Sequence, residues 1–382
     1  MSYYDNSPLR ARIGDSALAR RLSDSIQGEV LFDAFNRGQY STDASIYQIE
    51  PVGVVVPEVQ SDLDVLIAIA AEEGVPLLPR GAGTSQSGQT VGLALVVDVS
   101  KHLNSLIDLD LEGSTVTVEP GIVLDQLNRE LAPHGMMYAP DPTTSSRACV
   151  GGGIGNNTCG AHSVIYGKSL DHILEVDAIL ADGTQTHFRN MEAHELEAKL
   201  SGTGLESDIY RGVRNISQRN IAEIKARYPN IMRRVSGYNL DEVLTDDPFN
   251  LTKMVVGSEG TLCVVTEAKV NLVPRPTMTA LSILHFSDIV RASEAIVEVL
   301  RHEPSSIEVM DNILLQRSRE SLGHSGDLSF IQGDPGALLA VEFYGDSEGE
   351  LVSKTNTLKR DIEGKGLAYA CVNILDLSLI HI

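Results

Sequence analysis

The chain of 382 residues carries 30 lysine and arginine residues against 52 aspartate and glutamate residues, a formal net charge of −22. This acidic balance argues against general binding to nucleic acids or anionic membranes, because both need a cationic protein surface. Hydrophobic residues make up 42 % of the chain, which excludes a disordered protein, and the length predicts two or three domains.

The cysteines are too few and too scattered for a disulfide scaffold, a zinc finger or a ferredoxin-type cluster. We expect reduced, buried thiols at Cys149, Cys159, Cys263 and Cys371. The first thirty residues lack the apolar segment of a signal peptide, and apolar runs such as 93–97 are too short to span a bilayer. These features predict a cytoplasmic protein without a transmembrane segment, and peripheral association with a membrane partner stays open.

The first half of the chain alternates short apolar runs with helical patterns. Residues 1–45 are polar with a helical tendency, and we interpret them as an N-terminal extension. A helix is expected to begin at Ser61 and to end at Gly74. The remaining patterns predict strands at 52–56, 93–99 and 115–119 and a helix at 123–131.

The second half begins with a strand at 173–180 that closes in Asp182-Gly183, which predicts a hairpin. A helix follows at 206–228, and Pro274-Arg275-Pro276 indicates a domain boundary. Beyond the boundary the patterns predict strands at 280–285, 306–310, 337–343 and 367–373 and helices at 288–301, 311–321 and 348–363. Without the short helix 311–321 this order is β-α-β-β-α-β, the ferredoxin-like pattern.

The last six residues, 377–382, follow a predicted strand with no turn or cap. We expect them to be a non-native tail and the chain to be an N-terminal fragment of a longer protein.

Three glycine clusters contain the strongest functional signals. The first follows a predicted strand and includes Gly81, Gly83 and Gly88. It has no lysine, which excludes a Walker A loop, and its glycine spacing and following strand do not fit a Rossmann fingerprint. Glycines with exposed N–H groups can still form an anion-binding nest, to which Arg80 adds a charge and Thr84 and Ser85 add hydroxyl donors. The alternative is an ordinary turn between strands.

The second and third clusters strengthen the case for a nucleotide. We expect residues 141–160 to be a second glycine-rich loop, whose backbone lies against a planar or pyrophosphate ligand. The third cluster, 257–261, is expected between two β runs, where glycine marks close backbone approach.

With these clusters in order, the sequence resembles the flavoprotein superfamily of vanillyl-alcohol oxidase and para-cresol methylhydroxylase. Within that superfamily it is similar to the FAD-linked 2-hydroxy-acid dehydrogenases: the glycolate oxidase flavin subunit, D-lactate dehydrogenase and D-2-hydroxyglutarate dehydrogenase. The matching motifs are Pro-Arg-Gly-Ala-Gly-Thr-Ser-Gln-Ser-Gly-Gln at 79–89, Asp-Pro-Thr-Thr-Ser-Ser at 141–146, Gly-Gly-Gly-Ile-Gly-Asn-Asn at 151–157, Tyr-Gly-Lys at 166–168, Ser-Gly-Tyr-Asn-Leu at 236–240 and Gly-Ser-Glu-Gly-Thr-Leu at 257–262.

The resemblance implies an α+β architecture. Residues 46–276 would form a PCMH-type FAD-binding domain of two subdomains, and residues 277–376 a partial, ferredoxin-like substrate or cap domain of the FAD-linked oxidase C-terminal type. The long insert between Gly183 and Val235 is similar to the branch fused to a C-terminal iron–sulfur module.

The resemblance also implies a set of cofactor-binding residues. Residues 80–85 would hold the pyrophosphate, 141–146 and 151–160 would line the ribityl chain and the isoalloxazine, and 259–262 would contact the flavin. Because the first loop has no histidine, we expect FAD to be non-covalent. The full predicted set is Arg80, Gly81, Ala82, Gly83, Thr84, Ser85, Gln89, Asp141, Pro142, Thr143, Ser146, Gly151, Gly152, Gly155, Asn156, Asn157, Cys159, Gly160, Tyr166, Gly167, Glu259, Gly260, Thr261 and Leu262.

The implied activity is oxidation of a 2-hydroxy acid to a 2-oxo acid, with hydride transfer to flavin N5 and electrons passed to an iron–sulfur module, a quinone or a cytochrome. Catalytic residues, metal ligands and an iron–sulfur cluster are expected only beyond residue 382, because the family's Gly-Asp-Gly-Asn-His-like segment is not found. The segment 323–327 is only superficially similar to it.

Two alternatives and two further features stay open. The chain could be a non-catalytic FAD-binding subunit of a glycolate oxidase-type complex, whereas the loop spacing disfavours a nicotinamide enzyme. Cys159 and His162 could act near the flavin ring or simply pack, and the basic stretch 211–234 could attract an anionic substrate or be a solvated helix face.

Overall fold

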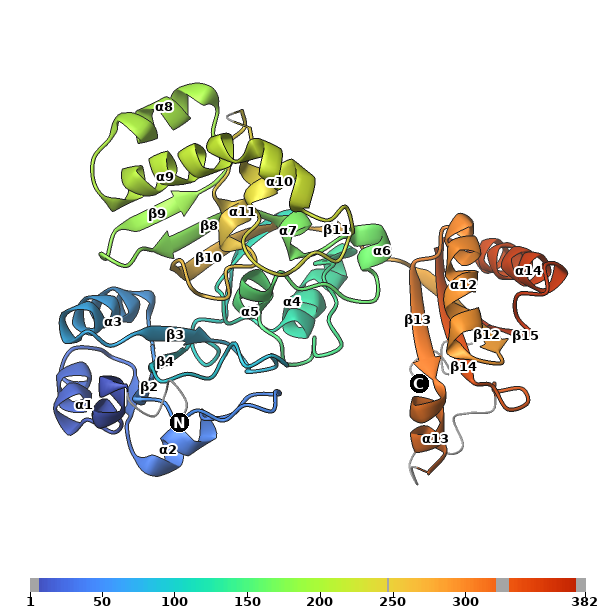
Figure 1. The fold of residues 1–382 in the computed structure, drawn as a ribbon, viewed down its shortest axis with the longest axis horizontal. Helices are drawn as coiled ribbons and strands as arrows, with labels where there is room; N and C mark the ends of the chain where they lie inside the picture. Colours follow the sequence, from blue (N-terminus) through green and yellow to red (C-terminus); the bar gives the residue numbers. More distant parts are fainter. Residues whose placement is uncertain (1–6, 246, 321–329, 376–382) are drawn as a thin grey trace. The chain divides into compact units, whose positions relative to one another are not determined.

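The computed structural model describes residues 7–245, 247–320 and 330–375 (Figure 1). The chain divides into two compact units. The N-terminal unit runs as far as Cys159 and continues over Lys168–Val273, whereas the C-terminal unit combines Gly160–Gly167 with the residues from Pro274 onward. The expected non-native tail and the segment 323–327 lie outside the described residues.

The first sheet of the N-terminal unit has four strands in the order β1-β2-β4-β3. Strands β2 and β3 each run parallel to β4, and β1 pairs antiparallel with β2. Strands β2 and β4 are buried along their whole length, which fits their Val-rich sequences. The strands are β1 (Glu29–Leu31), β2 (Gly53–Val56), β3 (Leu77–Arg80) and β4 (Leu95–Asp98).

Helices cover this sheet. Helix α3 begins after Val59 and ends at Gly74, which adopts the left-handed conformation at φ 64° that glycine tolerates without strain. Its apolar side chains join the core between helix and sheet. The helical segments here are η2 (Pro8–Arg12), α1 (Ser16–Ser23), α2 (Ala34–Gln39) and α3 (Gln60–Glu73).

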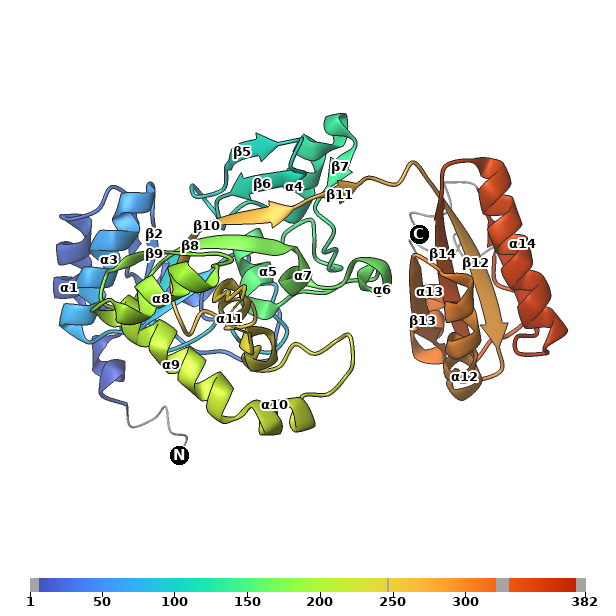
Figure 2. The same ribbon diagram turned by 90° about the horizontal axis from the view of Figure 1, so that it is seen from above.

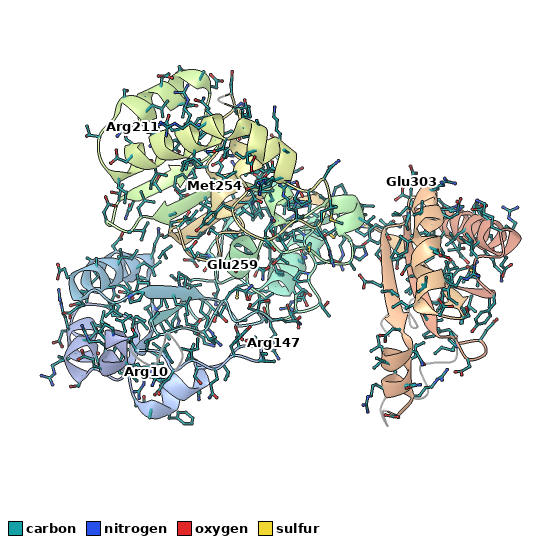
Figure 3. The ribbon with its side chains drawn as sticks, in the orientation of Figure 1. Arg10, Arg147, Arg211, Met254, Glu259 and Glu303 are labelled. Carbon is teal, nitrogen blue, oxygen red and sulfur yellow. The ribbon has the colours of Figure 1, made fainter. Side chains whose placement is uncertain are left out.

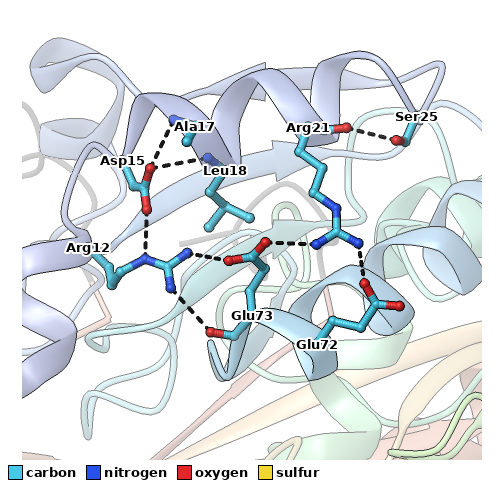
Figure 4. A network of polar contacts seen from close by, with 8 residues as sticks. All are labelled: Arg12, Asp15, Ala17, Leu18, Arg21, Ser25, Glu72 and Glu73. Atoms are coloured by element: carbon cyan, nitrogen blue, oxygen red, sulfur yellow. Dashed lines mark hydrogen bonds and ion pairs between the residues drawn. The ribbon is translucent and has the colours of Figure 1, made fainter.

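A network of charged side chains ties the N-terminal helices to the end of α3 (Figure 4). Arg12 donates to Glu73 at 2.9 Å and to Asp15 at 2.7 Å, and Arg21 donates to Glu73 at 2.7 Å and also pairs with Glu72. The shared Glu73 carboxylate bridges two arginines, so the helical segments that carry Arg12 and Arg21 are held against the first sheet's own helix.

The buried carboxylate of Asp62 organises the start of α3. Asp62 is only 3 % exposed and accepts four backbone N–H bonds, at 2.9–3.3 Å. Two donors, Gln27 and Gly28, precede β1, and the other two, Glu58 and Val59, precede the helix. One side chain therefore satisfies donors from two distant segments.

The second sheet of the N-terminal unit is antiparallel, with the order β5-β6-β10-β8-β9. The expected hairpin at Asp182-Gly183 joins β8 to β9. Figures 1 and 2 show α8 and α9 on the β8–β9 side of this sheet. The strands are β5 (Leu106–Asp110), β6 (Thr115–Val118), β8 (Ile173–Ile179), β9 (Gln185–Phe188) and β10 (Val264–Asn271); β7 (Met136–Met137) and β11 (Val273–Pro274) are two-residue strands.

The sequence predicted only some of the helices around the second sheet: it missed α5, α7, α8 and α11, and the expected helix 206–228 is divided into α9 and α10. The glycine run 151–156 lies in helix α5, so the expected loop over 141–160 is wrong there. A short helix, α11, precedes the third glycine cluster where a β run was expected. The segments are α4 (Leu124–Leu131), η3 (Ala132–His134), α5 (Val150–Asn156), α7 (Ser169–His172), α8 (Ala193–Ser201), α9 (Leu205–Arg219), α10 (Ile221–Arg227), η4 (Leu240–Val243) and α11 (Thr252–Val255).

Tertiary hydrogen bonds explain α5. Glycine is a poor helix former, so four glycines in seven residues argue against a helix in isolation. Here the first turn donates to Ile122 and Pro120, at 3.0 and 2.8 Å, and the last turn accepts from Gly257 and Glu259, at 2.8 and 2.9 Å. Packing against neighbouring backbone thus overrides local propensity.

The C-terminal unit has the ferredoxin-like arrangement that the sequence predicted, with an antiparallel sheet in the order β13-β14-β12-β15. Helices α12 and α14 pack together on one face, and α13 contributes Leu315 to a separate cluster of apolar side chains. The elements are β12 (Met278–Phe286), α12 (Ile289–Val299), η5 (Leu300–His302), β13 (Ser306–Asp311), α13 (Asn312–Glu320), β14 (Ala337–Gly345), α14 (Glu348–Gly364) and β15 (Ala370–Ile374).

The segment Gly160–Gly167, with its short helix α6 (Ser163–Tyr166), is fixed within the C-terminal unit by His162. The His162 ring stacks on Tyr344 with centroids 5.1 Å apart, and its Nε2 lies 3.2 Å from a carboxylate oxygen of Glu342. Both side chains that His162 contacts, Glu342 and Tyr344, lie on β14.

None of the helices in the described part of the chain has the length and apolar character that a bilayer span requires.

Candidate functional site

The three glycine clusters meet around one cavity in the N-terminal unit. A cavity of about 90 Å³ is bordered by the first loop, by helix α5 and by the third cluster. Glu259, labelled in Figure 3, belongs to its wall. The predicted residues that line it are Arg80, Gly81, Gln89, Gly151, Gly152, Gly155, Glu259 and Gly260.

A second, larger cavity adjoins the first. It measures about 320 Å³, has mostly apolar walls from α3, β3 and the end of β8, and shares Pro79, Gly260 and Cys263 with the smaller cavity. Thr261 and Leu262 of the predicted set line it. Both cavities have mainly apolar walls, and Arg80, Gln89 and Glu259 add polar groups to the smaller one, a composition typical of ligand sites.

Arg80 sits at the end of β3 and is 8 % exposed. Its guanidinium donates to the carbonyl oxygens of Tyr40, Thr90 and Thr42, at 3.2, 3.0 and 2.9 Å, and lies over the Tyr40 ring. Burial lowers the pKa of Arg80. The side chain therefore holds residues 40–42 and 90 against the first loop, and its predicted contact with a pyrophosphate stays a prediction.

The glycines of α5 keep the cavity open. A Cβ added at Gly152 would have no neighbour within 4 Å, and one at Gly155 would lie 3.8 Å from the backbone of Glu259 and Gly260. At Gly151 a Cβ would lie only 2.7 Å from Pro120. The absence of side chains here thus serves close helix packing at Gly151 and free volume at Gly152.

Glu259 and Gln89 connect the third cluster to the first loop. Gln89 Nε2 donates to Glu259 Oε1 at 3.4 Å. Burial raises the pKa of Glu259, and the hydrogen bond from Gln89 offsets part of this effect. Gln89 Oε1 is buried without a hydrogen-bond partner among the described residues, so it is available to a ligand donor.

The rest of the predicted set does not line either described cavity. Asn157 ends α5 and accepts a hydrogen bond from the Leu170 N–H at 3.0 Å, which indicates a structural role. Residues Gly160, Tyr166 and Gly167 belong to the C-terminal unit. The others are Ala82, Gly83, Thr84, Ser85, Asp141, Pro142, Thr143, Ser146, Asn156 and Cys159. Their assignment to the cofactor stays a prediction.

Several wall residues were missed by sequence reasoning. Thr90, Val99, Pro120 and Ser258 border the smaller cavity, and Cys263 borders both. The sequence did contain one signal, because Pro120-Gly121 directly follows the predicted strand 115–119. The structure shows why glycine is needed there: a Cβ on Gly121 would lie 2.1 Å from the Val99 carbonyl oxygen. All four cysteines were predicted to be buried, and Cys149 and Cys371 are, whereas Cys159 and Cys263 are only partly buried. Desolvation still raises the pKa of Cys263 to about 12.

One cluster in the C-terminal unit has the composition of a metal site. Glu298, His302 and Asp361 bring their ligand atoms within 4.8 Å of one another. The Lys365 ammonium lies 2.6 Å from Glu298 and 2.8 Å from Asp361, so a cation is already supplied by the chain. An ion-pair network accounts for this cluster.

The N-terminal unit offers what an FAD molecule needs. Gly152 borders free volume, Gln89 presents a buried acceptor that has no partner among the described residues, and the two cavities adjoin at Pro79, Gly260 and Cys263. These residues therefore fit the cofactor that the sequence motifs predict.

Comparison with known families gives two matches. Residues 51–189 match a family described as FAD binding domain, and residues 275–372 match one described as FAD linked oxidases, C-terminal domain. The chain is 31 % identical over 349 residues to a D-2-hydroxyglutarate dehydrogenase of Pseudomonas putida, an alignment covering 89 % of this chain and 35 % of that protein. It is 28 % identical to the glycolate oxidase subunit GlcD of Bacillus subtilis, covering 75 % of this chain and 52 % of that protein.

A solved structure of alkyldihydroxyacetonephosphate synthase has the same fold, with a TM-score of 0.66 and 17 % identity over 94 % of this chain and 60 % of that one. The chain spans about a third of the length of the D-2-hydroxyglutarate dehydrogenases that it matches. The expectation that it is an N-terminal fragment gains no support from these matches and stays a prediction.

Proposed function

The chain belongs to the FAD-linked oxidase group of the vanillyl-alcohol oxidase and para-cresol methylhydroxylase superfamily, and from this membership we propose that it functions as an FAD-dependent 2-hydroxy-acid dehydrogenase. Its cofactor is FAD. The substrate class is a small 2-hydroxy acid such as D-2-hydroxyglutarate, D-lactate or glycolate, and the electrons go to an acceptor other than oxygen. The names of the similar proteins support this substrate class.

The observation that carries the proposal is the meeting of the three glycine clusters around the two adjoining cavities. When bound, FAD supplies the hydride acceptor for oxidation of the substrate C–H bond. In this proposal Gly81 of the first loop and the glycines of α5 would lie against the cofactor, because they border the smaller cavity. Arg80 holds the first loop in shape through its three carbonyl contacts. Gln89, from the same loop, and Glu259, from the third cluster, add polar groups to the cavity wall.

We further propose that FAD is held without a covalent bond, because residues 79–89 contain no histidine. After acid precipitation and filtration, the yellow flavin is expected in the filtrate. Flavin that stays with the precipitated polypeptide would refute this part of the proposal.

Anaerobic mixing with each of the three hydroxy acids tests the activity. Bleaching of the flavin absorbance by one of them, followed by reduction of an artificial dye, is the expected result. A protein that binds FAD but is bleached by none of them would instead be a flavin-binding subunit without activity of its own. A protein that binds no FAD would overturn the assignment as a whole.

A further inference from the structure

The Gln89–Glu259 pair has an arrangement that the assignment of an FAD site does not by itself explain. The two side chains come from the first loop and the third cluster, 170 residues apart, and meet at 3.4 Å in the wall of the smaller cavity. One hydrogen bond joins them, whereas Gln89 Oε1 is buried without a partner among the described residues. The pair is therefore only half satisfied.

The backbone at Glu259 indicates that the position of this side chain is imposed. Glu259 has φ 53°, a left-handed conformation that is costly for a residue with a side chain. Its neighbours Gly257 and Gly260 also have positive φ but carry no such cost. The Glu259 N–H donates to Gly155 at 2.9 Å, which fixes the strained residue against α5. The fold thus directs a carboxyl group to the cavity at a place where glycine would fit more easily.

The charges around this carboxyl are few. Among the described residues that line the cavity, the other ionisable side chains are Arg80 and Cys263. Arg80 directs three of its N–H donors to carbonyl oxygens, and burial raises the pKa of the Cys263 thiol to about 12. No described cation forms an ion pair with Glu259. Burial raises the pKa of Glu259, so a nearby anion has to raise it less before the carboxyl takes up a proton.

We propose that Glu259 recognises the cofactor in its protonated form, so that binding of each FAD takes up about one proton. This inference rests on the proposed FAD site. A protonated carboxyl can donate its O–H to a phosphate oxygen, while Gln89 Oε1 accepts from a neighbouring sugar hydroxyl. The pair therefore offers one donor and one acceptor side by side, which is complementary to the sugar–phosphate part of a dinucleotide.

Repulsion between two anions that share the cavity sets the magnitude. Gly81 and Glu259 both line the smaller cavity, so a phosphate at Gly81 would lie close to the Glu259 carboxyl. A phosphate held near Gly81 and an ionised Glu259, ~6 Å apart at an effective permittivity of ~20, repel strongly enough to change a proton-binding equilibrium ~100-fold. The dissociation constant for FAD is therefore expected to rise ~10-fold per pH unit, up to ~100-fold in total, once Glu259 ionises in the free protein.

Titration of apoprotein with FAD between pH 5.5 and 8.5, followed by flavin fluorescence, tests the proposal. We expect the affinity of the wild type for FAD to fall as pH rises. The affinity of Glu259→Gln should stay, at every pH, as high as that of the wild type at the acidic end of the range. Glu267→Gln is the matched control, because burial also raises the pKa of Glu267 although that carboxyl lies outside both cavity walls. The control variant should retain the wild-type slope.

Calorimetry in buffers of different ionisation enthalpy measures the proton directly and does not depend on any variant. Uptake of about one proton by the wild type at neutral pH, and of none by Glu259→Gln, is the expected result. A flat affinity profile for the wild type, or an unchanged slope in a folded Glu259→Gln protein, would overturn the inference but leave the FAD site intact. Failure of the wild type to bind FAD at any pH would overturn both.

Discussion

Replacing Asp62 tests how much of the first sheet depends on one buried carboxylate. In Asp62→Asn the amide oxygen can keep the three donors that share Oδ2, whereas the Gln27 N–H loses its acceptor on Oδ1. In Asp62→Ala all four donors lose their acceptor. A buried donor without a partner costs ~1–3 kcal/mol, so we expect losses of ~2 kcal/mol for the asparagine variant and ~4 kcal/mol or more for alanine.

Hydrogen exchange read by mass spectrometry is the suitable assay, together with urea unfolding. Peptides that contain residues 27–28 and 58–59 should exchange faster in both variants, and more so in Asp62→Ala. Asp64→Asn on the same helix is the control, because its carboxylate accepts one exposed side-chain hydrogen bond, from Gln185. A loss below ~1 kcal/mol for Asp62→Ala would refute the claim that this carboxylate holds the two segments together.

Three further predictions concern helix α5, a salt bridge and the second core. Gly151→Ala should cost ~1–3 kcal/mol, because its Cβ would lie 2.7 Å from a proline, whereas Gly152→Ala should be neutral or stabilising by up to ~1 kcal/mol; urea melts of the two variants distinguish them. The Arg189 hydrogen bond lowers the pKa of Glu195 to about 2 from an ordinary 4.5. The stability that this ion pair contributes is therefore present above pH 4.5 and lost as pH falls toward 2. Glu195→Gln should flatten the dependence of the unfolding free energy on pH over that window. Leu358→Ala, at a side chain with no exposed surface in the C-terminal unit, should cost ~2–5 kcal/mol, and unchanged exchange rates in that unit would contradict the core assignment.

The regular elements of the C-terminal unit could be predicted because their signals are local. Alternating apolar residues and Asp or Ser caps place β12 to β15 and their helices near their observed bounds. The sheet order followed from the same pattern, since a β-α-β-β-α-β chain packs its helices together on one face.

Helices α5 and α11 could not be predicted, because tertiary contacts rather than propensity form them. The four glycines of α5 disfavour a helix until Gly257 and Glu259 donate to its last turn. Val255 and Val256 favour a strand by composition, yet Val255 ends a short helix that positions the third cluster. In both cases the deciding contacts come from residues that are distant in the sequence.

The candidate site was predictable in its clusters and less so in its walls. The glycine motifs identified Gly81, Gly152 and Glu259, which do border the smaller cavity. Arg80 was assigned to a phosphate on its charge and on the family resemblance, whereas two of the three carbonyl groups that accept its hydrogen bonds come from Tyr40 and Thr42, 40 and 38 residues away. A local sequence pattern carries no information about contacts between residues so far apart in the chain.

The eight residues Gly160–Gly167 have a consequence for how this protein can be divided. Because they are embedded in the sequence of the first unit but complete the second, the polypeptide passes between the units three times. A stretch that starts at Pro274 would therefore lack the ring that stacks on Tyr344, and a single proteolytic cut at 274–276 would leave residues 160–167 of the second unit on the N-terminal piece. The boundary in the sequence between the two family matches is thus not the boundary between the two compact units.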